Sequence, residues 1–192
     1  MKKPVIIVSG LPRSGTSMVM KMLEAGGIDI LTDGLRAADE DNPQGYYEYE
    51  RVKSLNKEAD WIYTKSGQAI KVISALLYHL PADLSYKVLF MQRDMGEILA
   101  SQERMLSRLG TGQHANGPRQ DVLAKKFQAH LQQVRDWIAA QAHMDCLYAN
   151  YNELVQGSLA QVHAIATFLE VPLNVDKMTA VVNPAFYRSR RE

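Results

Sequence analysis

The sequence lacks disulfide-forming cysteines and any long apolar run. It has a single cysteine in 192 residues, so no intramolecular disulfide can form, and a disulfide-stabilised secreted domain is excluded. No apolar stretch approaches the ~20 residues of a membrane-spanning helix, and the run from Val5 to Val8 is too short for a signal peptide. We therefore expect a cytoplasmic protein with no membrane partner.

An excess of charge of one sign is also missing. The 22 basic and 21 acidic residues leave a net charge of +1, so no overall field attracts nucleic acid. The five histidines are scattered, and no pair has the spacing of metal ligands, which predicts no metal site. The length fits one domain covering 1–192. Any anion-binding site must then come from local placement of donors.

Predicted strands and helices alternate along the chain. Apolar runs typical of strands buried on both faces occur at 5–8 and 86–91, with a short third strand at 146–149. Apolar spacing and caps predict helices at 18–25, 48–59, 96–107, 122–143 and, after a Ser158 cap, up to Leu169. This alternation predicts an α/β fold of three layers, a mainly parallel central sheet flanked by helices.

Two polar, turn-rich segments are predicted to be flexible loops, at about 32–47 and 109–119. The first is a candidate lining for an acceptor site, and the second, with its glycines, is a candidate lid. Ligands of parallel sheets bind at the carboxyl ends of the strands, so we expect the functional residues there.

A glycine-containing loop, Gly10-Leu-Pro-Arg-Ser-Gly-Thr-Ser17, joins the first predicted strand to the first helix. In such a loop the backbone N–H groups and the helix N-terminus converge on an anion, and Arg13 adds a full charge. The spacing is that of the P-loop pattern G-x-x-x-x-G-K-[ST], which favours a fold like that of the P-loop NTPases. Thr16 replaces the lysine that supports the phosphates in ATP-binding members. A capped turn without ligand is the alternative.

This loop resembles the 5′-phosphosulfate-binding loop of the sulfotransferases, which use 3′-phosphoadenylyl sulfate (PAPS). Their loop reads Pro-[Lys/Arg]-Ser-Gly-[Thr/Ser]-[Thr/Ser]. These enzymes also place an arginine at a strand end and a serine eight positions later, which together bind the 3′-phosphate. Arg93 and Ser101 have that spacing here; alone, they could equally be a surface charge and a packing residue. The resemblance implies a PAPS-binding set of Arg13, Ser14, Gly15, Thr16, Ser17, Arg93 and Ser101.

Weaker similarities to bacterial members extend along the chain. They are Asn42-Pro-Gln-Gly-Tyr-Tyr-Glu48 and Tyr151-Asn-Glu-Leu154, the latter resembling Tyr-Glu-x-Leu. The Arg-Lys-Gly segment that adds a 3′-phosphate contact in cytosolic members is absent. Candidates to replace it are Arg188, Arg190 and Arg191, although a solvated basic tail explains them equally well.

The resemblance implies in-line, metal-independent transfer of a sulfuryl group to a hydroxyl or amine, with adenosine 3′,5′-bisphosphate as product. Arg13 would stabilise the leaving phosphate. Lys71, a lone charge in the apolar segment 69–80, is the candidate cation for the sulfuryl oxygens, and Lys65 is the competing match. Lys71 could instead extend to the surface. Glu48 is the candidate general base, or alternatively an acid in the first turn of a helix.

Together these features predict a PAPS-dependent sulfotransferase with a small-molecule or glycan acceptor. Two alternatives stay open. A P-loop kinase for a nucleotide or small molecule would need the missing loop lysine, and it would not need Arg93 and Ser101. A catalytically silent nucleotide-binding protein would keep the phosphate site and transfer nothing.

Overall fold

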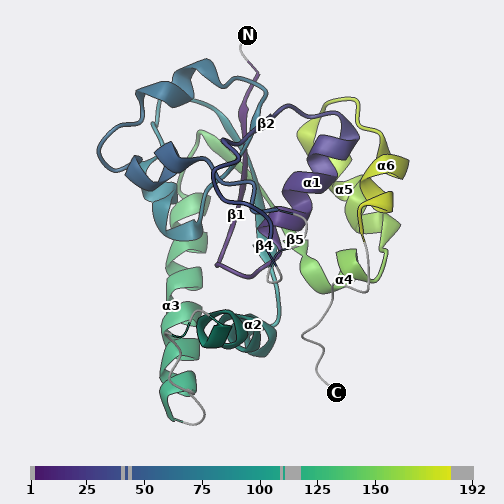
Figure 1. The fold of residues 1–192 in the computed structure, drawn as a ribbon. Helices are drawn as coiled ribbons and strands as arrows, with labels where there is room; N and C mark the ends of the chain where they lie inside the picture. Colours follow the sequence, from purple (N-terminus) through teal and green to yellow (C-terminus); the bar gives the residue numbers. More distant parts are fainter. Residues whose placement is uncertain (1–2, 40–41, 43–44, 109, 111–117, 183–192) are drawn as a thin grey trace.

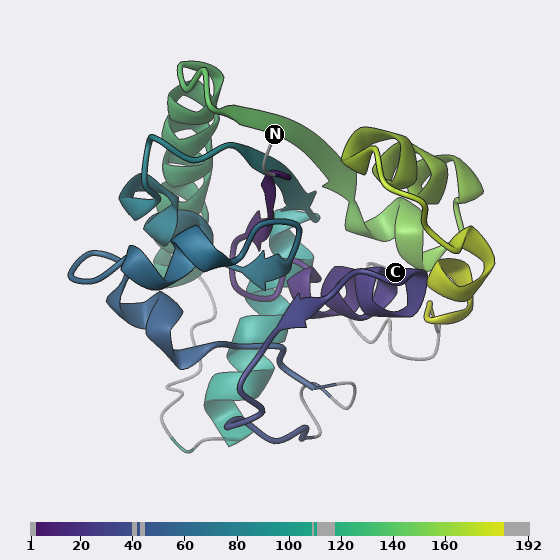
Figure 2. The same ribbon diagram turned by 90° about the horizontal axis from the view of Figure 1, so that it is seen from above.

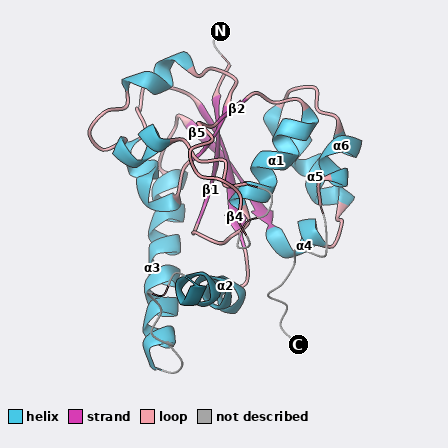
Figure 3. Cartoon of the chain, viewed as in Figure 1, coloured by secondary structure: helices cyan, strands magenta, loops and turns pink. Residues whose placement is uncertain are grey.

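The computed structural model describes residues 3–39, 42, 45–108, 110 and 118–182, and a parallel five-stranded sheet forms its centre (Figure 3). Every strand pairing in this sheet is parallel. The strands lie in the order β2 (Ile30–Leu31), β3 (Ala69–Lys71), β1 (Val5–Gly10), β4 (Tyr86–Gln92) and β5 (Met144–Asn150).

Helices cover both faces of the sheet (Figures 1 and 2). On one face lie α1 (Thr16–Gly26), α5 (Leu159–Leu169) and α6 (Val175–Ala180). The other face is covered by α3 (Pro118–Ala139) and the 3₁₀ helices Glu50–Ser54, Asp60–Thr64 and Ser74–His79. The short α4 (Tyr151–Val155) follows β5, and α2 (Met95–Arg108) follows β4 and crosses beneath the sheet in Figure 1. The predicted three-layer α/β fold is confirmed.

The central strand β1 contributes to both layers of the core. Ile6 and Val8 pack in the cluster that includes α1, whereas Val5 and Ile7 pack in the cluster on the opposite face. Because side chains alternate between the faces of a strand, a strand covered on both sides favours apolar residues on both faces, as at 5–8. This is the physical reason for the unbroken apolar run at the start of the chain.

The turn from β1 into α1 depends on Gly15. This residue is the N-cap of α1 and has a φ of 99°. A Cβ added to it would lie 2.2 Å from Cδ2 of Tyr151. Glycine is therefore required here for two reasons, since the backbone is left-handed and an aromatic ring fills the space.

The long predicted elements are confirmed, with shifts at their ends. Strands β1, β4 and β5 extend beyond the predicted runs, and α1, α2 and α5 match their predictions closely. Ser158 caps α5 by accepting from the N–H of Gln161. Helix α3 begins four residues earlier than predicted, at Pro118, because proline fits the first turn of a helix.

The predicted helix at 48–59 is wrong. Tyr49 is extended, with φ −129° and ψ 116°, and only the short 3₁₀ helix Glu50–Ser54 follows. The carbonyl of Glu48 accepts from the N–H of Asp33 at 3.2 Å, and the Asp33 carboxylate accepts from the N–H of Glu50 at 2.5 Å. These long-range bonds take the place of the first helical turn, so Glu48 is not an acid at a helix N-terminus.

The sequence did not predict strands β2 and β3, which form one side of the sheet. The apolar segment 69–80 divides into β3 and the 3₁₀ helix Ser74–His79. Of the predicted lid at 109–119, residues 118 and 119 belong to α3, whereas 109 and 111–117 lie outside the described residues. The lid therefore stays a prediction.

Gly15→Ala and Gly27→Ala form a matched pair that tests the packing at the phosphate loop. Both glycines have φ near 100°, but a Cβ at Gly27 meets nothing within 4 Å. We expect Gly27→Ala to lower the free energy of unfolding by about 1 kcal/mol, the cost of the left-handed backbone. Gly15→Ala should cost about 1–3 kcal/mol more, because the Tyr151 ring must move. Urea unfolding measures both, and equal losses would contradict this account.

Candidate functional site

The predicted site residues lie where β1, β3 and β4 reach their carboxyl ends. The loop 11–15 follows β1, Arg93 follows β4, and Lys71 is the last residue of β3. Because the three strands are adjacent and parallel, these ends meet at one edge of the sheet. Ser101 reaches the same place from α2, which follows β4 directly.

The loop presents donors that suit an anion. The N-cap of α1 makes no side-chain hydrogen bond, and the first N–H groups of any α-helix have no partner within the helix. Ser14 is 1% exposed, and its hydroxyl has no hydrogen-bond partner among the described residues. A buried hydroxyl without a partner costs free energy unless a ligand satisfies it. The structure therefore fits a group that supplies acceptor oxygens at this loop.

Arg13, Arg93 and Ser101 are brought into direct contact. The Nε of Arg13 donates to the hydroxyl of Ser101 at 2.9 Å. The Nη1 of Arg93 donates to the carbonyl oxygen of Arg13 at 2.9 Å. Arg13 itself has a φ of 72°, a left-handed backbone that directs its carbonyl and its side chain to these partners. Two sequence segments eighty residues apart thus form one cationic cluster.

Arg93 is held by two further groups that the sequence did not indicate. Its Nε donates to Oε2 of Glu97 at 2.9 Å, and its guanidinium lies 4.2 Å from the centroid of the Tyr151 ring. Glu97 in turn accepts from the side-chain amide of Asn152 at 3.0 Å. The four-residue spacing of Arg93 and Glu97 is the one sequence signal that could have revealed their ion pair.

Lys71 lies on the other side of the loop. Its Nζ is 3.4 Å from the hydroxyl of Ser17 and 3.6 Å from Oε1 of Glu48, and it also donates to the carbonyl of Tyr46. Its side chain is only 8% exposed. The competing residue Lys65 follows the 3₁₀ helix Asp60–Thr64 as its C-cap. Lys71 is therefore the lysine that contacts the phosphate loop, and it does not extend to the surface.

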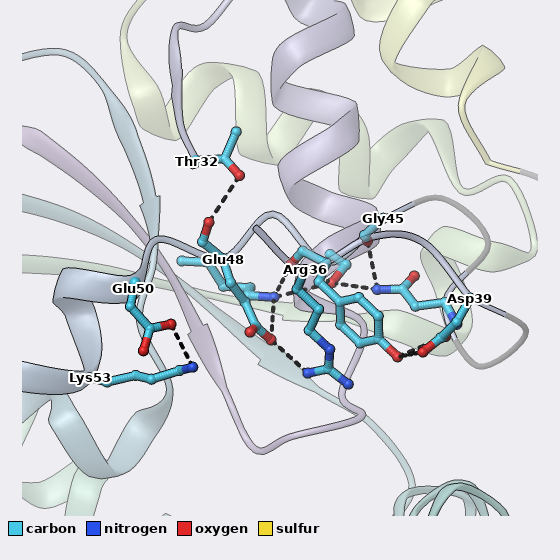
Figure 4. A network of polar contacts seen from close by, with 11 residues as sticks. Thr32, Arg36, Asp39, Gly45, Glu48, Glu50 and Lys53 are labelled. Atoms are coloured by element: carbon cyan, nitrogen blue, oxygen red, sulfur yellow. Dashed lines mark hydrogen bonds and ion pairs between the residues drawn. The ribbon is translucent and has the colours of Figure 1, made fainter. Parts of the chain in front are cut away.

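Glu48 is paired with two cations. Its Oε1 is 3.1 Å from Nη1 of Arg36, and Lys71 approaches the same oxygen. Figure 4 draws the ion pair of Glu48 with Arg36 as a dashed line. The Arg36 guanidinium stacks on the Tyr46 ring at 3.3 Å from its centroid. Arg36 had no sequence signal, since it lies in a segment that was read only as a loop. The Glu48 side chain keeps 29% exposure, so a solvent-borne group can reach it.

The segment before Glu48 closes against the phosphate loop. The side-chain amide of Asn42 donates to the hydroxyl of Ser17 at 3.0 Å and to the carbonyl of Gly45 at 2.6 Å. The Tyr46 hydroxyl donates to the carboxylate of Asp39, with 2.7 and 2.8 Å to its two oxygens (Figure 4). The described part of the predicted loop 32–47 therefore contacts the candidate site. Asn42 and Tyr46 belong to the segment that resembled bacterial sulfotransferases.

Electrostatics at Lys71 favour its neutral form more than usual. Burial lowers the pKa of Lys71 to about 8, the Glu48 carboxylate opposes this shift, and the nearby Arg36 and Arg13 add to it. Burial also raises the pKa of the Tyr46 and Tyr151 hydroxyls. The charge of Lys71 therefore changes at a lower pH than that of an ordinary lysine, near pH 8.

The described residues include no cluster of three or more His, Cys, Asp or Glu side chains that could hold a metal ion. No helix in the same part of the chain is long and apolar enough to cross a membrane. The arginines predicted as replacements near the C-terminus, at 188, 190 and 191, lie outside the described residues.

Comparison with known proteins decides the family. Residues 3–192 match the family described as the sulfotransferase domain. The chain belongs to this family. No curated protein matches the sequence.

The fold was also compared with solved structures. A sulfotransferase domain from the curacin biosynthetic pathway is 14% identical, with a TM-score of 0.53, over 92% of this chain and 76% of that one. The sulfotransferase domain of the Synechococcus PCC 7002 olefin synthase is 13% identical, with a TM-score of 0.49, over 99% and 85%. A sugar kinase from Janibacter sp. HTCC2649 is 14% identical, with a TM-score of 0.43, over 96% and 98%. Only the first of these is close enough to support the assignment of the fold.

The side chain of Lys71 should titrate near pH 8. We expect the ¹³Cε resonance that is lost in Lys71→Met to show its midpoint there, whereas exposed Lys53, whose pKa its partner Glu50 raises, should titrate at a higher pH than an ordinary lysine. Glu48→Gln removes the charge that favours the ammonium, so it should lower the Lys71 midpoint further. A Lys71 midpoint above pH 10 would show that the side chain is not buried at this loop.

Proposed function

We propose that this sulfotransferase-family protein transfers a sulfuryl group from PAPS to a hydroxyl or amine acceptor. The observation that carries the proposal is the contact of Arg13 with both Arg93 and Ser101. The first residue belongs to the loop that resembles the 5′-phosphosulfate site, and the other two form the pair that resembles the 3′-phosphate site. Separate surface charges would have no reason to converge in this way.

The residues present fit PAPS. The loop 14–17 offers N–H groups, hydroxyls and the unsatisfied Ser14 oxygen for the 5′ end, with Lys71 beside Ser17. Arg93 and Ser101 would hold the 3′-phosphate. The Ser101 oxygen already accepts from Arg13, and a serine hydroxyl that accepts can still donate its own hydrogen, which suits a phosphate. When bound, PAPS supplies an activated sulfuryl group on a phosphate that can leave.

Lys71 and Arg13 are the cations for the transferring charge. Sulfuryl transfer, like phosphoryl transfer, spreads negative charge over equatorial oxygens, so catalysis depends on positioning and electrostatic stabilisation. Lys71 is fixed by Tyr46 and Glu48 and screened from water at 8% exposure. In its protonated form it stabilises negative oxygen beside Ser17 more strongly than an exposed lysine would.

Glu48 is the proposed general base. It is partly exposed, and it lies within 3.6 Å of the lysine that borders the loop. A carboxylate in this place takes the proton from the hydroxyl or amine of the acceptor as its oxygen or nitrogen attacks the sulfuryl group. Arg36 holds its orientation through the 3.1 Å ion pair.

The acceptor stays a prediction, a small molecule or a glycan, as do the cytoplasmic location and the single domain over 1–192. Thr16 in place of the loop lysine argues against the kinase alternative. The two experiments that follow distinguish an active sulfotransferase from the catalytically silent alternative.

Calorimetric titration with adenosine 3′,5′-bisphosphate tests the nucleotide site. We expect binding in the micromolar range, about −8 kcal/mol, and weaker binding of magnesium–ATP. Arg93→Ala should weaken bisphosphate binding at least about tenfold, because it removes the charged donor proposed for the 3′-phosphate. Lys87→Ala is the control and should bind normally. It removes a cation that is paired with Asp145 of β5 and with Glu170, the C-cap of α5. Tight magnesium–ATP binding without bisphosphate binding would favour the kinase.

Glu48→Gln tests the base. With PAPS and a panel of alcohols, phenols, amines and sugars, we expect it to slow transfer by about 10²–10⁴-fold while bisphosphate binding is retained. The assay is run below the Lys71 midpoint measured for each protein, so that the Lys71 ammonium is compared with itself. Glu50→Gln is the matched control, since the ion pair of Glu50 is with Lys53 (Figure 4). Full transfer activity in Glu48→Gln would show that Glu48 is not the general base. If the wild-type protein transfers sulfate to none of these acceptors, the catalytically silent alternative is favoured.

A further inference from the structure

We propose that Glu97, supported by Asn152, is a positioning residue that orients Arg93 and thereby sets the preference for a nucleotide with a 3′-phosphate. The inference rests on the proposed function, because it concerns the same nucleotide site. Glu97 lies between Arg93 and Ser101 in the sequence, and it is buried, at 4% exposure.

The contacts fix Arg93 on three sides. Glu97 accepts from the Nε edge at 2.9 Å, Tyr151 covers one face of the guanidinium at 4.2 Å, and the carbonyl of Arg13 accepts from Nη1 at 2.9 Å. The side chains of Arg93 and Glu97 are 7% and 4% exposed. An arginine has many rotamers and loses that freedom when it binds a ligand. These contacts are made by the protein's own groups, so they set the guanidinium plane and leave less of this freedom to be lost on binding.

Glu97 must use both of its oxygens as acceptors. Oε2 accepts from Arg93, and Oε1 accepts from the Nδ2 of Asn152 at 3.0 Å. A glutamine at this place has one acceptor and one donor, so it opposes a donor either at Arg93 or at Asn152. The position therefore requires a carboxylate for hydrogen bonding as well as for charge.

Two effects of Glu97 oppose each other at a phosphate. Its negative charge partly cancels the positive charge of Arg93, which weakens attraction for an anion. Its hydrogen bond holds the guanidinium in place, which strengthens binding. We infer that orientation dominates, because both partners are buried and an arginine without its partner is an uncompensated buried charge that moves toward other acceptors or water.

The test compares two nucleotides that differ only in the 3′-phosphate. Calorimetry gives the affinities for adenosine 3′,5′-bisphosphate and adenosine 5′-phosphate, and their ratio is the readout. We expect Glu97→Gln to lower this ratio by about tenfold, the size of one charge-assisted hydrogen bond, while the affinity for adenosine 5′-phosphate stays within about twofold. A merely structural role would change both affinities together.

A second substitution tests rescue. In Glu97→Gln/Asn152→Asp, the glutamine oxygen can accept from Arg93 while its amide donates to the new aspartate. We expect this double variant to recover the wild-type ratio within about threefold, although each single variant lowers it. Glu103→Gln is the control, because Glu103 is on the same helix but accepts from Gln120 of α3, and it should leave the ratio unchanged.

The outcomes separate the proposals. A ratio that is unchanged or raised in Glu97→Gln overturns the inference, as does an equal loss for both nucleotides or a double variant that does not recover. If Glu97→Gln fails to fold, Asn152→Asp alone must lower the ratio, since it places a second carboxylate 3.0 Å from the first. If the wild type does not prefer the bisphosphate at all, the proposed nucleotide site itself is wrong, whatever Glu97 does.

Discussion

The buried ion pair of Arg93 and Glu97 joins the parts of the molecule on which the candidate site depends. Arg93 follows β4, Glu97 lies in the first turn of α2, and Asn152, which donates to Glu97, belongs to α4. Through the carbonyl of Arg13 the same arginine is bonded to the phosphate loop. A buried pair of this kind adds little net stability compared with apolar packing, but removing one partner is costly. It therefore fixes the relative position of these segments more than it stabilises the fold.

The phosphate loop is constrained at both ends. Arg13, near its start, contacts Ser101 and Arg93, whereas Ser17, near its end, contacts Asn42 and Lys71. The first set of contacts comes from β4 and α2, and the second comes from β3 and the segment before Glu48. A short loop between a buried strand and a helix can place donors accurately only if its neighbours do not move. The all-parallel order of β3, β1 and β4 provides those neighbours.

The sequence predicted the features that local pattern determines. Strands β1 and β4 were recognisable because burial on both faces leaves an unbroken apolar run, and the loop with Arg93 and Ser101 was recognisable by spacing. The helix at 48–59 was wrong because the backbone of Glu48 and Glu50 is bonded to residues 32 and 33, which no local pattern reveals. Strand β3 has three residues, too few for a periodicity.

The roles of individual side chains were predictable only in part. Lys71 could be singled out as a lone charge in an apolar segment, but its lowered pKa depends on burial and on Arg36, a residue without any sequence signal. Glu97 escaped notice because an acid in the first turn of a helix is common. Its burial and its two hydrogen bonds are tertiary facts.

A crystal structure of the protein with adenosine 3′,5′-bisphosphate tests the central claim most directly, namely that one cluster binds both ends of a bisphosphate nucleotide. The account predicts the 5′-phosphate at the N–H groups of residues 14–17 and the 3′-phosphate within hydrogen-bonding distance of Arg93 and Ser101, with the Arg93–Glu97 pair intact. A nucleotide bound with its 3′-phosphate in solvent, or with Arg93 turned away from it, would contradict the account.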